Sequence, residues 1–132
     1  MCMRGDIYYV DFGSDTSSCV QSGTRPAVVV SNNTANRYSP VITVLPLTAK
    51  THKRRNFPTH VYLPQNAGFG LSKNSMALAE QIISIDKSKL INKVGEIHDA
   101  KTLESIDAAL RIQLGVEPAI SYDPQSISAK GN

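Results

Sequence analysis

Short apolar runs separated by polar segments dominate the first two-thirds of the chain. Runs of about four to eight residues that are rich in Val, Ile and Tyr are typical of β-strands. The pattern predicts strands at residues 6–12, 25–32, 41–47 and 59–63, a longer fifth strand at 75–85 and a short last strand at 91–97. The run from Arg25 to Val30 is continuously apolar after its first residues. We therefore expect that strand to be buried on both faces.

The segments between these runs predict loops and turns, because three of them are rich in Ser, Asn, Gly or Pro and the fourth, at residues 50–55, is a polar and basic cluster. These loops and turns cover residues 13–23, 32–40, 50–55 and 66–70. Residues 86–90 have the composition of a single helical turn. Several short strands joined in this way predict an antiparallel small barrel or a half-open sheet.

One helix is predicted near the C-terminal end of the chain. Asp99 suits the N-cap position and Gly115 the position just after the last turn. The apolar residues between them fall on one face at helical spacing, and they are Leu103, Ile106, Ala109, Leu110 and Leu114. We expect this face to pack on the sheet.

The length of 132 residues fits one domain with a real core. Residues 117–132 contain two prolines and no apolar period, which is typical of a loose tail. We therefore expect a single domain at residues 1–116 and a flexible tail at 117–132.

Neither a membrane span nor an export signal is apparent, because no apolar run is long enough and the N-terminus lacks an apolar core. We expect a cytoplasmic protein. Cys2 and Cys19 have no metal-ligand spacing, and the sequence leaves open two free thiols or one disulfide.

Charge is distributed unevenly along the chain. Residues 16–79 contain no Asp or Glu but seven basic residues, namely Arg25, Arg37, Lys50, Lys53, Arg54, Arg55 and Lys73. The rest of the chain holds seven basic and eleven acidic residues, so the net charge of +3 understates the local excess. Such a segment attracts a polyanion such as RNA, or else forms a solvated basic face.

Two predicted strands carry reactive side chains at their ends. Arg25 opens one strand, and its guanidinium is a fixed cation with a planar fork of donors that suits a phosphate. Thr48 follows the next strand and offers a hydroxyl. If these ends meet, they form a site for phosphodiester chemistry. Alternatively, Arg25 pairs with a carboxylate at the rim and Thr48 is only a strand end.

No cluster of Asp, Glu, His or Cys has the spacing of a metal site. RNA does not need a metal for cleavage, because its 2′-hydroxyl can attack the adjacent phosphorus. The histidines are His52, His60 and His98. A two-histidine acid–base pair and solvated surface histidines both remain open.

Ordered blocks over residues 3–116 resemble the MazF/PemK family of toxin endoribonucleases. They are residues 4–12, 23–32, 46–48, 58–61, 79–82 and 85–87, followed by the segment that leads to Leu114. The resemblance implies a mainly β fold with a C-terminal helix, the SH3-like small barrel of the MazF/CcdB toxin type, and a homodimer.

The resemblance implies a sequence-selective, metal-independent endoribonuclease that needs no cofactor. It would cleave single-stranded RNA to 2′,3′-cyclic phosphate and 5′-hydroxyl ends and would be inhibited by an acidic MazE-like antitoxin. The alternatives are a non-catalytic CcdB-like gyrase-binding toxin and a nucleic-acid-binding barrel. CcdB-like toxins end in Trp-Gly-Ile, whereas this chain has no Trp.

The resemblance assigns catalysis to Arg25 and Thr48. Arg25 would stabilise the phosphorane and is a candidate acid, and the base is unassigned. The remaining expected contacts to RNA are Arg4, Ser17, Ser18, Gln21, Lys53, Arg54, Arg55, Phe57, Glu80 and Gln81. The basic residues would hold phosphates, Ser17, Ser18 and the glutamines would read base edges, and Phe57 would stack on a base or pack in the core.

Overall fold

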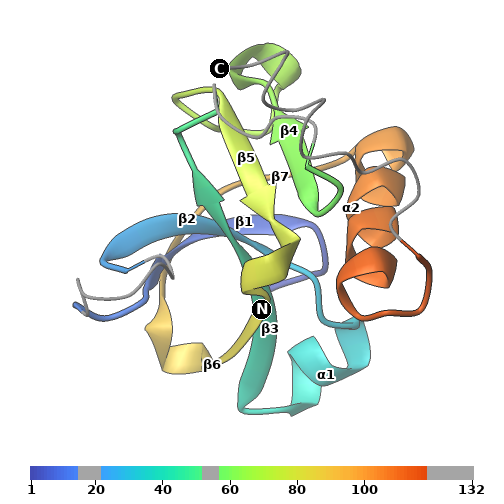
Figure 1. Cartoon of the computed structure of the whole chain (residues 1–132). Helices are drawn as coiled ribbons and strands as arrows, with labels where there is room; N and C mark the ends of the chain where they lie inside the picture. Colours follow the sequence, from blue (N-terminus) through green and yellow to red (C-terminus); the bar gives the residue numbers. More distant parts are fainter. Residues whose placement is uncertain (15–21, 52–56, 119–132) are drawn as a thin grey trace.

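The computed structural model describes residues 1–14, 22–51 and 57–118 (Figure 1). The strands are β1 (Asp6–Asp11), β2 (Thr24–Val29), β3 (Val41–Thr48), β4 (His60–Leu63), β5 (Ser75–Leu78), β6 (Ile83–Asp86) and β7 (Leu90–Glu96). The α-helices are α1 (Asn33–Tyr38) and α2 (Ala100–Gln113), and single 3₁₀ turns are η1 (Gln65–Ala67), η2 (Ala79–Gln81) and η3 (Lys87–Lys89). The expected mainly β fold with a C-terminal helix is confirmed.

The strands form one antiparallel, strongly bent sheet. Its order is β4-β5-β3-β2-β1-β7, and β6 pairs with the remaining part of β3. The bend lies in β3, which pairs with β5 at Leu47–Thr48 and with β6 at Val41–Val44. In the described residues the two end strands, β4 and β7, do not pair with each other. The sheet is therefore barrel-like but not closed.

Strand β2 lies in the middle of this sheet with core on both faces, as its unbroken apolar sequence predicts. Val28 belongs to one buried cluster, which also includes Ile106 and Ala109 of α2. Ala27 and Val29 belong to a second cluster on the opposite face, together with Cys2. Cys2 is a buried free thiol. Cys19 lies outside the described residues.

The prediction of one continuous strand at residues 75–85 is wrong. The segment forms β5, turns through η2 and resumes as β6. The turn occurs where the neighbouring strand β3 passes through Pro46, which has no N–H to donate to a ladder. β5 and β6 can therefore each follow one half of the bent β3, but a single straight strand cannot follow both.

The turn predicted at residues 32–40 is in fact the short helix α1. The side chain of Asn32 caps it by accepting from the Ala35 backbone N–H at 2.8 Å. Asn36 is fully buried, and its amide donates to the Ser31 carbonyl at 2.8 Å. A buried amide requires such partners, so tertiary context selects the helix over the irregular turn that the composition favours.

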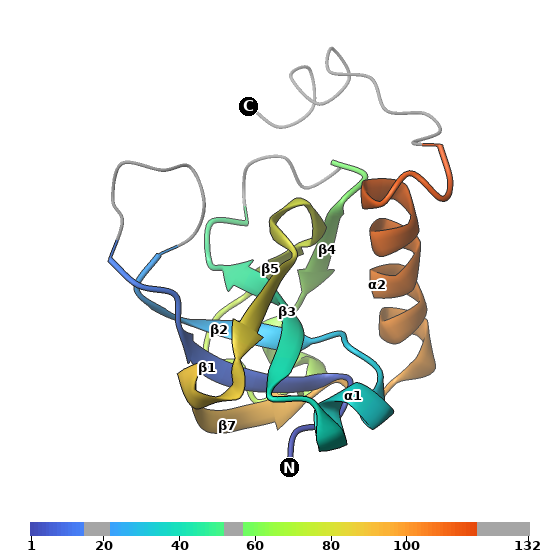
Figure 2. The ribbon, with the colours of Figure 1, turned by 90° about the horizontal axis from the view of Figure 1, so that it is seen from below.

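Helix α2 begins as predicted, because the Asp99 side chain accepts from the Thr102 backbone N–H at 2.9 Å. Its apolar face packs beside β4 and η2 (Figures 1 and 2). Leu114 is an exception to the predicted stripe, since the helix ends at Gln113 and Leu114 is 62% exposed. Gly115 follows with the left-handed φ of +75° that favours glycine at this position.

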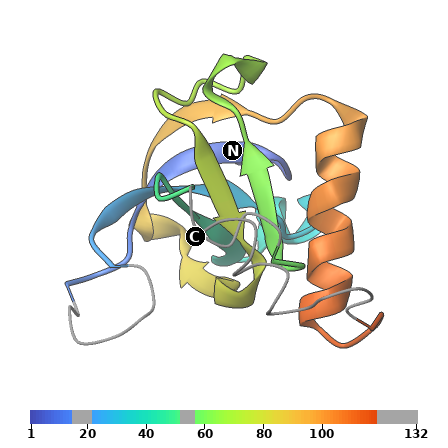
Figure 3. The same ribbon diagram turned by 45° about the horizontal axis from the view of Figure 1, so that its top comes forward.

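The connection between β4 and β5 runs against β7, and Figure 3 shows the two segments meeting at the tip of the β4–β5 hairpin. The contact is made by backbone at Gly70 and Gly95. A β-carbon on Gly70 would lie 3.1 Å from the Gly95 α-carbon. The two ends of the open sheet are thus joined by a close backbone contact that needs glycine on both sides.

Within the described part of the chain, no helix combines the length and the apolar composition needed to cross a membrane.

Candidate active site

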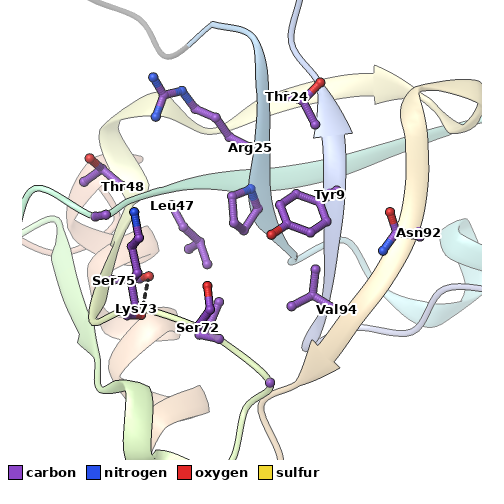
Figure 4. Close-up of a pocket in the computed structure, with 14 residues that line it drawn as sticks. Tyr9, Thr24, Arg25, Leu47, Thr48, Ser72, Lys73, Ser75, Asn92 and Val94 are labelled. Carbon is purple, nitrogen blue, oxygen red and sulfur yellow. Dashed lines mark hydrogen bonds between the residues drawn. The ribbon is translucent and has the colours of Figure 1, made fainter.

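A pocket of about 470 Å³ lies where β1, β2, β3 and β7 meet the loop before β5 (Figure 4). Its described lining consists of Tyr9, Thr24, Arg25, Pro26, Leu47, Thr48, Ala49, Gly70, Leu71, Ser72, Lys73, Ser75, Asn92 and Val94. Arg25 and Thr48 therefore share one pocket. Antiparallel pairing explains this, because Ala27 of β2 lies opposite Pro46 of β3, so the start of β2 lies beside the end of β3.

The Arg25 side chain is held in place through Nε of its guanidinium, which leaves the two terminal nitrogens for other partners. Its Nε donates to the Ser22 carbonyl at 2.7 Å. Among the described residues, no carboxylate forms an ion pair with Arg25. The rim pairing that the sequence left open as an alternative is not seen in that part of the chain. The two terminal nitrogens can therefore donate to an anion bound in the pocket.

Thr48 is buried, and its hydroxyl oxygen accepts from the Lys50 backbone N–H at 3.2 Å. A threonine hydroxyl has one hydrogen to donate besides its acceptor lone pairs. Because the backbone contact uses an acceptor position, the O–H remains available to a ligand. Figure 4 places Thr48 on the same side of the pocket as the Arg25 guanidinium.

Lys73 supplies a second cation, from the loop between η1 and β5. In Figure 4 its side chain extends along the pocket wall toward Thr48. The loop is braced, because the Ser75 hydroxyl donates to the Lys73 carbonyl at 2.9 Å and the Asn74 side chain accepts from the Gln65 N–H at 2.8 Å. Sequence reasoning missed Lys73 as a site residue. The available signal was a lone basic residue before a predicted strand.

The charged and polar groups of the pocket share one chemical character. The described lining holds two cations, one amide and several hydroxyls, but no carboxylate and no imidazole. Such a surface suits a phosphate. Across the described residues, no group of three or more His, Cys, Asp and Glu side chains could hold a metal ion.

Arg4 does not line this pocket. Its Nε donates to the Val30 carbonyl at 3.0 Å, and its guanidinium forms an ion pair with Asp107 of α2. These contacts tie the start of β1 to α2. A role for Arg4 at substrate phosphates stays a prediction, and it would require Arg4 to act from outside the pocket.

Glu80 lies on η2, outside the pocket, in a polar cluster with Thr59 and His60. The Thr59 hydroxyl donates to Oε1 at 2.7 Å, and His60 Nε2 lies 2.6 Å from Oε2. Partial burial raises the pKa of Glu80, but the hydrogen bonds from His60 and Thr59 outweigh burial, so the pKa lies below its usual value. Glu80 is thus held as a carboxylate by its neighbours.

The other predicted RNA contacts that fall on described residues, Phe57 and Gln81, do not line the pocket. Gln81 is half-buried on η2, and Phe57 is half-buried with its ring 4.9 Å from the ring of His60. His98 packs edge-on against Phe69 at 5.5 Å, and neither His60 nor His98 lines the pocket. The predictions for Ser17, Ser18, Gln21, Lys53, Arg54 and Arg55, and that for His52, fall on residues outside the described ones.

Solved structures that are similar to this chain over most of their length include the following three. An endoribonuclease in complex with its cognate antitoxin from a mycobacterial species is 28% identical, with a TM-score of 0.71 and coverage of 89% of this chain and 98% of that one. An endoribonuclease from a mycobacterial species is 27% identical, with a TM-score of 0.68 and coverage of 86% and 91%. MazF from Deinococcus radiodurans is 25% identical, with a TM-score of 0.68 and coverage of 86% and 96%.

The family model of the PemK-like, MazF-like toxins of type II toxin–antitoxin systems matches residues 3–114. That range spans the seven strands, both α-helices and every described residue of the pocket lining. The chain belongs to this family of toxins.

Proposed function

We propose that this protein is a sequence-selective endoribonuclease that cleaves single-stranded RNA without a metal ion and acts as the toxin of a toxin–antitoxin pair. The observation that carries the proposal is the meeting of Arg25, Thr48 and Lys73 in one pocket that has no carboxylate or imidazole in its described lining. The names of two similar structures, endoribonucleases from mycobacterial species, support the same activity.

The proposed reaction is a transesterification within the RNA. The 2′-oxygen attacks the adjacent phosphorus, the bond from phosphorus to the 5′-oxygen breaks, and a 2′,3′-cyclic phosphate and a 5′-hydroxyl result. The 2′-oxygen loses a proton and the departing 5′-oxygen gains one, so this step consumes no water. The enzyme must stabilise the negative charge that develops on the non-bridging oxygens.

The Arg25 fork suits this charge, because two parallel N–H groups can donate to two oxygens of one phosphate. The Thr48 hydroxyl would donate to a non-bridging oxygen or orient the 2′-hydroxyl. Lys73 adds a second positive charge, on a side chain that extends along the pocket wall toward Thr48. These three side chains come from separate elements, so a phosphate bound between them would be held from several directions.

The proposed chemistry predicts that cleavage persists in a chelator. Purified protein is incubated with a long RNA in EDTA, and the cut ends are mapped. We expect undiminished cutting and 5′-hydroxyl ends, because protein side chains alone stabilise the charge. The ends are identified by whether a kinase can label them directly or only after phosphatase treatment.

A metal-dependent ribonuclease treated in the same way is the control for complete chelation. Loss of cutting in EDTA, or 5′-phosphate ends, would contradict the mechanism. An absence of cutting with and without chelator would contradict the proposed activity itself and would favour a binding function.

We also infer that the inhibitor is an acidic antitoxin segment that binds across the basic part of the chain. Residues 16–79 carry seven basic and no acidic residues. Two of the basic residues, Arg25 and Lys73, face the pocket. The similar mycobacterial endoribonuclease was solved with its cognate antitoxin, which supports a partner of this kind. A segment that ordered on this surface would gain charge-assisted contacts and exclude RNA.

This mode of inhibition predicts binding that weakens as salt rises, because the contacts are largely electrostatic. The affinity of an acidic antitoxin peptide is measured by calorimetry across a salt series. RNA should compete with the peptide. An inhibitor whose affinity ignored salt, and which bound together with RNA, would rule out this mode.

A further inference from the structure

The pocket has two halves that differ in chemistry. One half carries Arg25, Thr48 and Lys73, which the proposed function uses for the phosphate. The other half is formed by Pro26, Tyr9 and Asn92, on three neighbouring strands. This second half has no assigned role in phosphate binding.

The sheet register makes these three residues one continuous row. Tyr9 of β1 lies opposite Pro26 of β2 and opposite Asn92 of β7. Directly opposed residues on one face have β-carbons about 4.5–5.5 Å apart, so their side chains form a shared surface. The row therefore places the aromatic ring of Tyr9 between the pyrrolidine ring of Pro26 and the side-chain amide of Asn92.

The polar groups of this row are directed at the pocket. Figure 4 shows the Tyr9 hydroxyl pointing toward the middle of the pocket and the Asn92 side chain pointing in from β7. Within the described part of the chain, neither the Tyr9 hydroxyl nor the Asn92 amide forms a side-chain hydrogen bond. Both groups are therefore available to a ligand.

An aromatic ring and an amide next to a phosphate site are the two components that recognise an unpaired nucleobase. Aromatic rings contact bases of any identity, whereas an amide offers one donor and one acceptor that match a particular base edge. The pocket volume of about 470 Å³ also lies within the range of small-ligand sites, about 300–1,000 Å³.

We propose that Pro26, Tyr9 and Asn92 form a nucleobase subsite that binds one base next to the cleaved phosphodiester, with Tyr9 contacting the base and Asn92 reading its edge. This inference rests on the proposed function, because the phosphate of the same nucleotide would lie at Arg25, Thr48 and Lys73. It makes the sheet surface, and not the loops alone, a determinant of the cleaved sequence.

The decisive variant is Asn92→Asp, which replaces the amide donor with a second acceptor at nearly constant shape. Asn92 is exposed on β7, so the change should not affect folding. The new carboxylate will slow cutting in general by placing negative charge near the phosphate, so the readout is the sequence of the cut sites and not the rate. The matched control is Asn66→Asp, the same change at an exposed amide that does not line the pocket.

Each protein cuts a mixed RNA pool, and the sequences at the cut ends are compared. We expect Asn92→Asp to change the base preference at a single position next to the cut by about tenfold, within the range for one bidentate base contact. Other positions should keep their preference. The Asn66→Asp profile should match that of the wild type.

A binding selection separates this inference from the proposed activity. A 2′-O-methyl RNA pool has no nucleophile and cannot be cleaved by transesterification, but it still presents bases and phosphates. Wild-type protein that fails to cut RNA would sink the proposed activity, while a change in the bound sequences with Asn92→Asp would still support the subsite. Identical preferences for wild type and Asn92→Asp, in both cutting and binding, would overturn the subsite.

Tyr9 provides a second test. Tyr9→Phe keeps the ring and should retain binding of the 2′-O-methyl pool, whereas Tyr9→Leu removes the ring and should weaken binding by about fivefold or more, the usual loss for one base–aromatic stacking contact. Thermal melting checks that both variants are folded. Equal affinity for Tyr9→Leu and Tyr9→Phe in folded protein would count against contact between the ring and a base.

Discussion

Replacing Arg25 with alanine is expected to lower RNA cleavage by a factor of about 10²–10³, the usual loss for one strong transition-state donor. The reason is the geometry of the fork. Its Nε donates to the Ser22 carbonyl, and among the described residues no carboxylate forms an ion pair with Arg25, so the terminal nitrogens can donate to a phosphate in the pocket. Loss of the side chain therefore removes charge stabilisation at the phosphate.

The protein should remain folded after this change. Arg25 is only half-buried, and Nε makes one hydrogen bond to a backbone carbonyl within three residues. Circular dichroism and thermal melting of the variant should match the wild type. The measurement of activity is the single-turnover rate on a saturating RNA, which separates chemistry from binding.

Two further variants at the site refine this expectation. Arg25→Lys keeps a charge but loses the planar fork, so it should recover only part of the rate. Thr48→Ala should cost less than Arg25→Ala, because a neutral hydroxyl donates a weaker hydrogen bond than a guanidinium.

The matched control is Arg37→Ala, which removes an exposed arginine from α1, where it lies 5.4 Å from the Tyr38 ring. This variant should cleave normally, because Arg37 does not line the pocket. Near-normal turnover by folded Arg25→Ala protein would remove Arg25 from the reaction and leave the pocket as a binding site.

The meeting of Arg25 and Thr48 was predictable from sequence because it depends on neighbouring strands. Residues 25–32 and 41–47 are both apolar runs joined by a short connection, and antiparallel pairing then places the start of one beside the end of the next. The two-sided burial of β2 followed from its lack of alternation. Strong local patterns thus predicted β2 and β3, and their pairing brings together the two strand ends whose meeting the sequence left conditional.

The other half of the site depends on contacts between distant segments. Tyr9 and Asn92 become neighbours only through the pairing of β1 with β7, and this pairing contains two register shifts. A local pattern does not reveal a bulge, and a one-residue shift moves a side chain to the opposite face. Lys73 is similarly placed by a loop whose course is fixed by its contact with β7.

The errors in the predicted elements have the same origin. The sequence predicts one strand at residues 75–85 because the chain is mainly apolar there. The strand β3, with which this segment pairs, bends, so the segment is divided into β5 and β6. Residues 32–40 read as a turn because Asn, Ser and Pro are frequent, but a buried Asn36 and the Asn32 cap favour a helix. In both segments tertiary partners decided between conformations that local composition left close in free energy.

Gly95→Ala is expected to be among the most destabilising single-methyl substitutions in this protein. A β-carbon there would overlap the Phe69 carbonyl oxygen and lie 2.8 Å from its carbonyl carbon. Both atoms are backbone, so no side-chain rotation relieves the overlap and the two segments must separate. We expect a loss of about 3 kcal/mol or more, at the upper end for overpacking, and a melting temperature lower by roughly 10 °C.

Alanine substitutions at two other glycines separate the effect of backbone overlap on stability from the effect of a positive φ. Gly70→Ala combines a similar overlap, with the Val94 carbonyl, with a φ of +87° that disfavours alanine. Gly13→Ala carries the unfavourable φ of +86° alone, since nothing lies within 4 Å of the place that the new methyl group would occupy, and should cost only about 1 kcal/mol. Denaturant unfolding of the three variants gives the free energies. A loss at Gly95 no larger than that at Gly13 would show that the backbone contact is dispensable.

The same contact connects stability to the proposed activity. Gly70 and Val94 both line the pocket, and the loop that continues from Gly70 carries Lys73. If the β4–β5 connection separates from β7 in Gly95→Ala, the part of the pocket wall that carries Lys73 should move away from Arg25 and Thr48. We therefore expect Gly95→Ala to cut RNA poorly even below its melting temperature, whereas Gly13→Ala, which leaves this contact intact, should cut normally. Full activity of folded Gly95→Ala protein would mean that the position of this wall does not matter for cleavage.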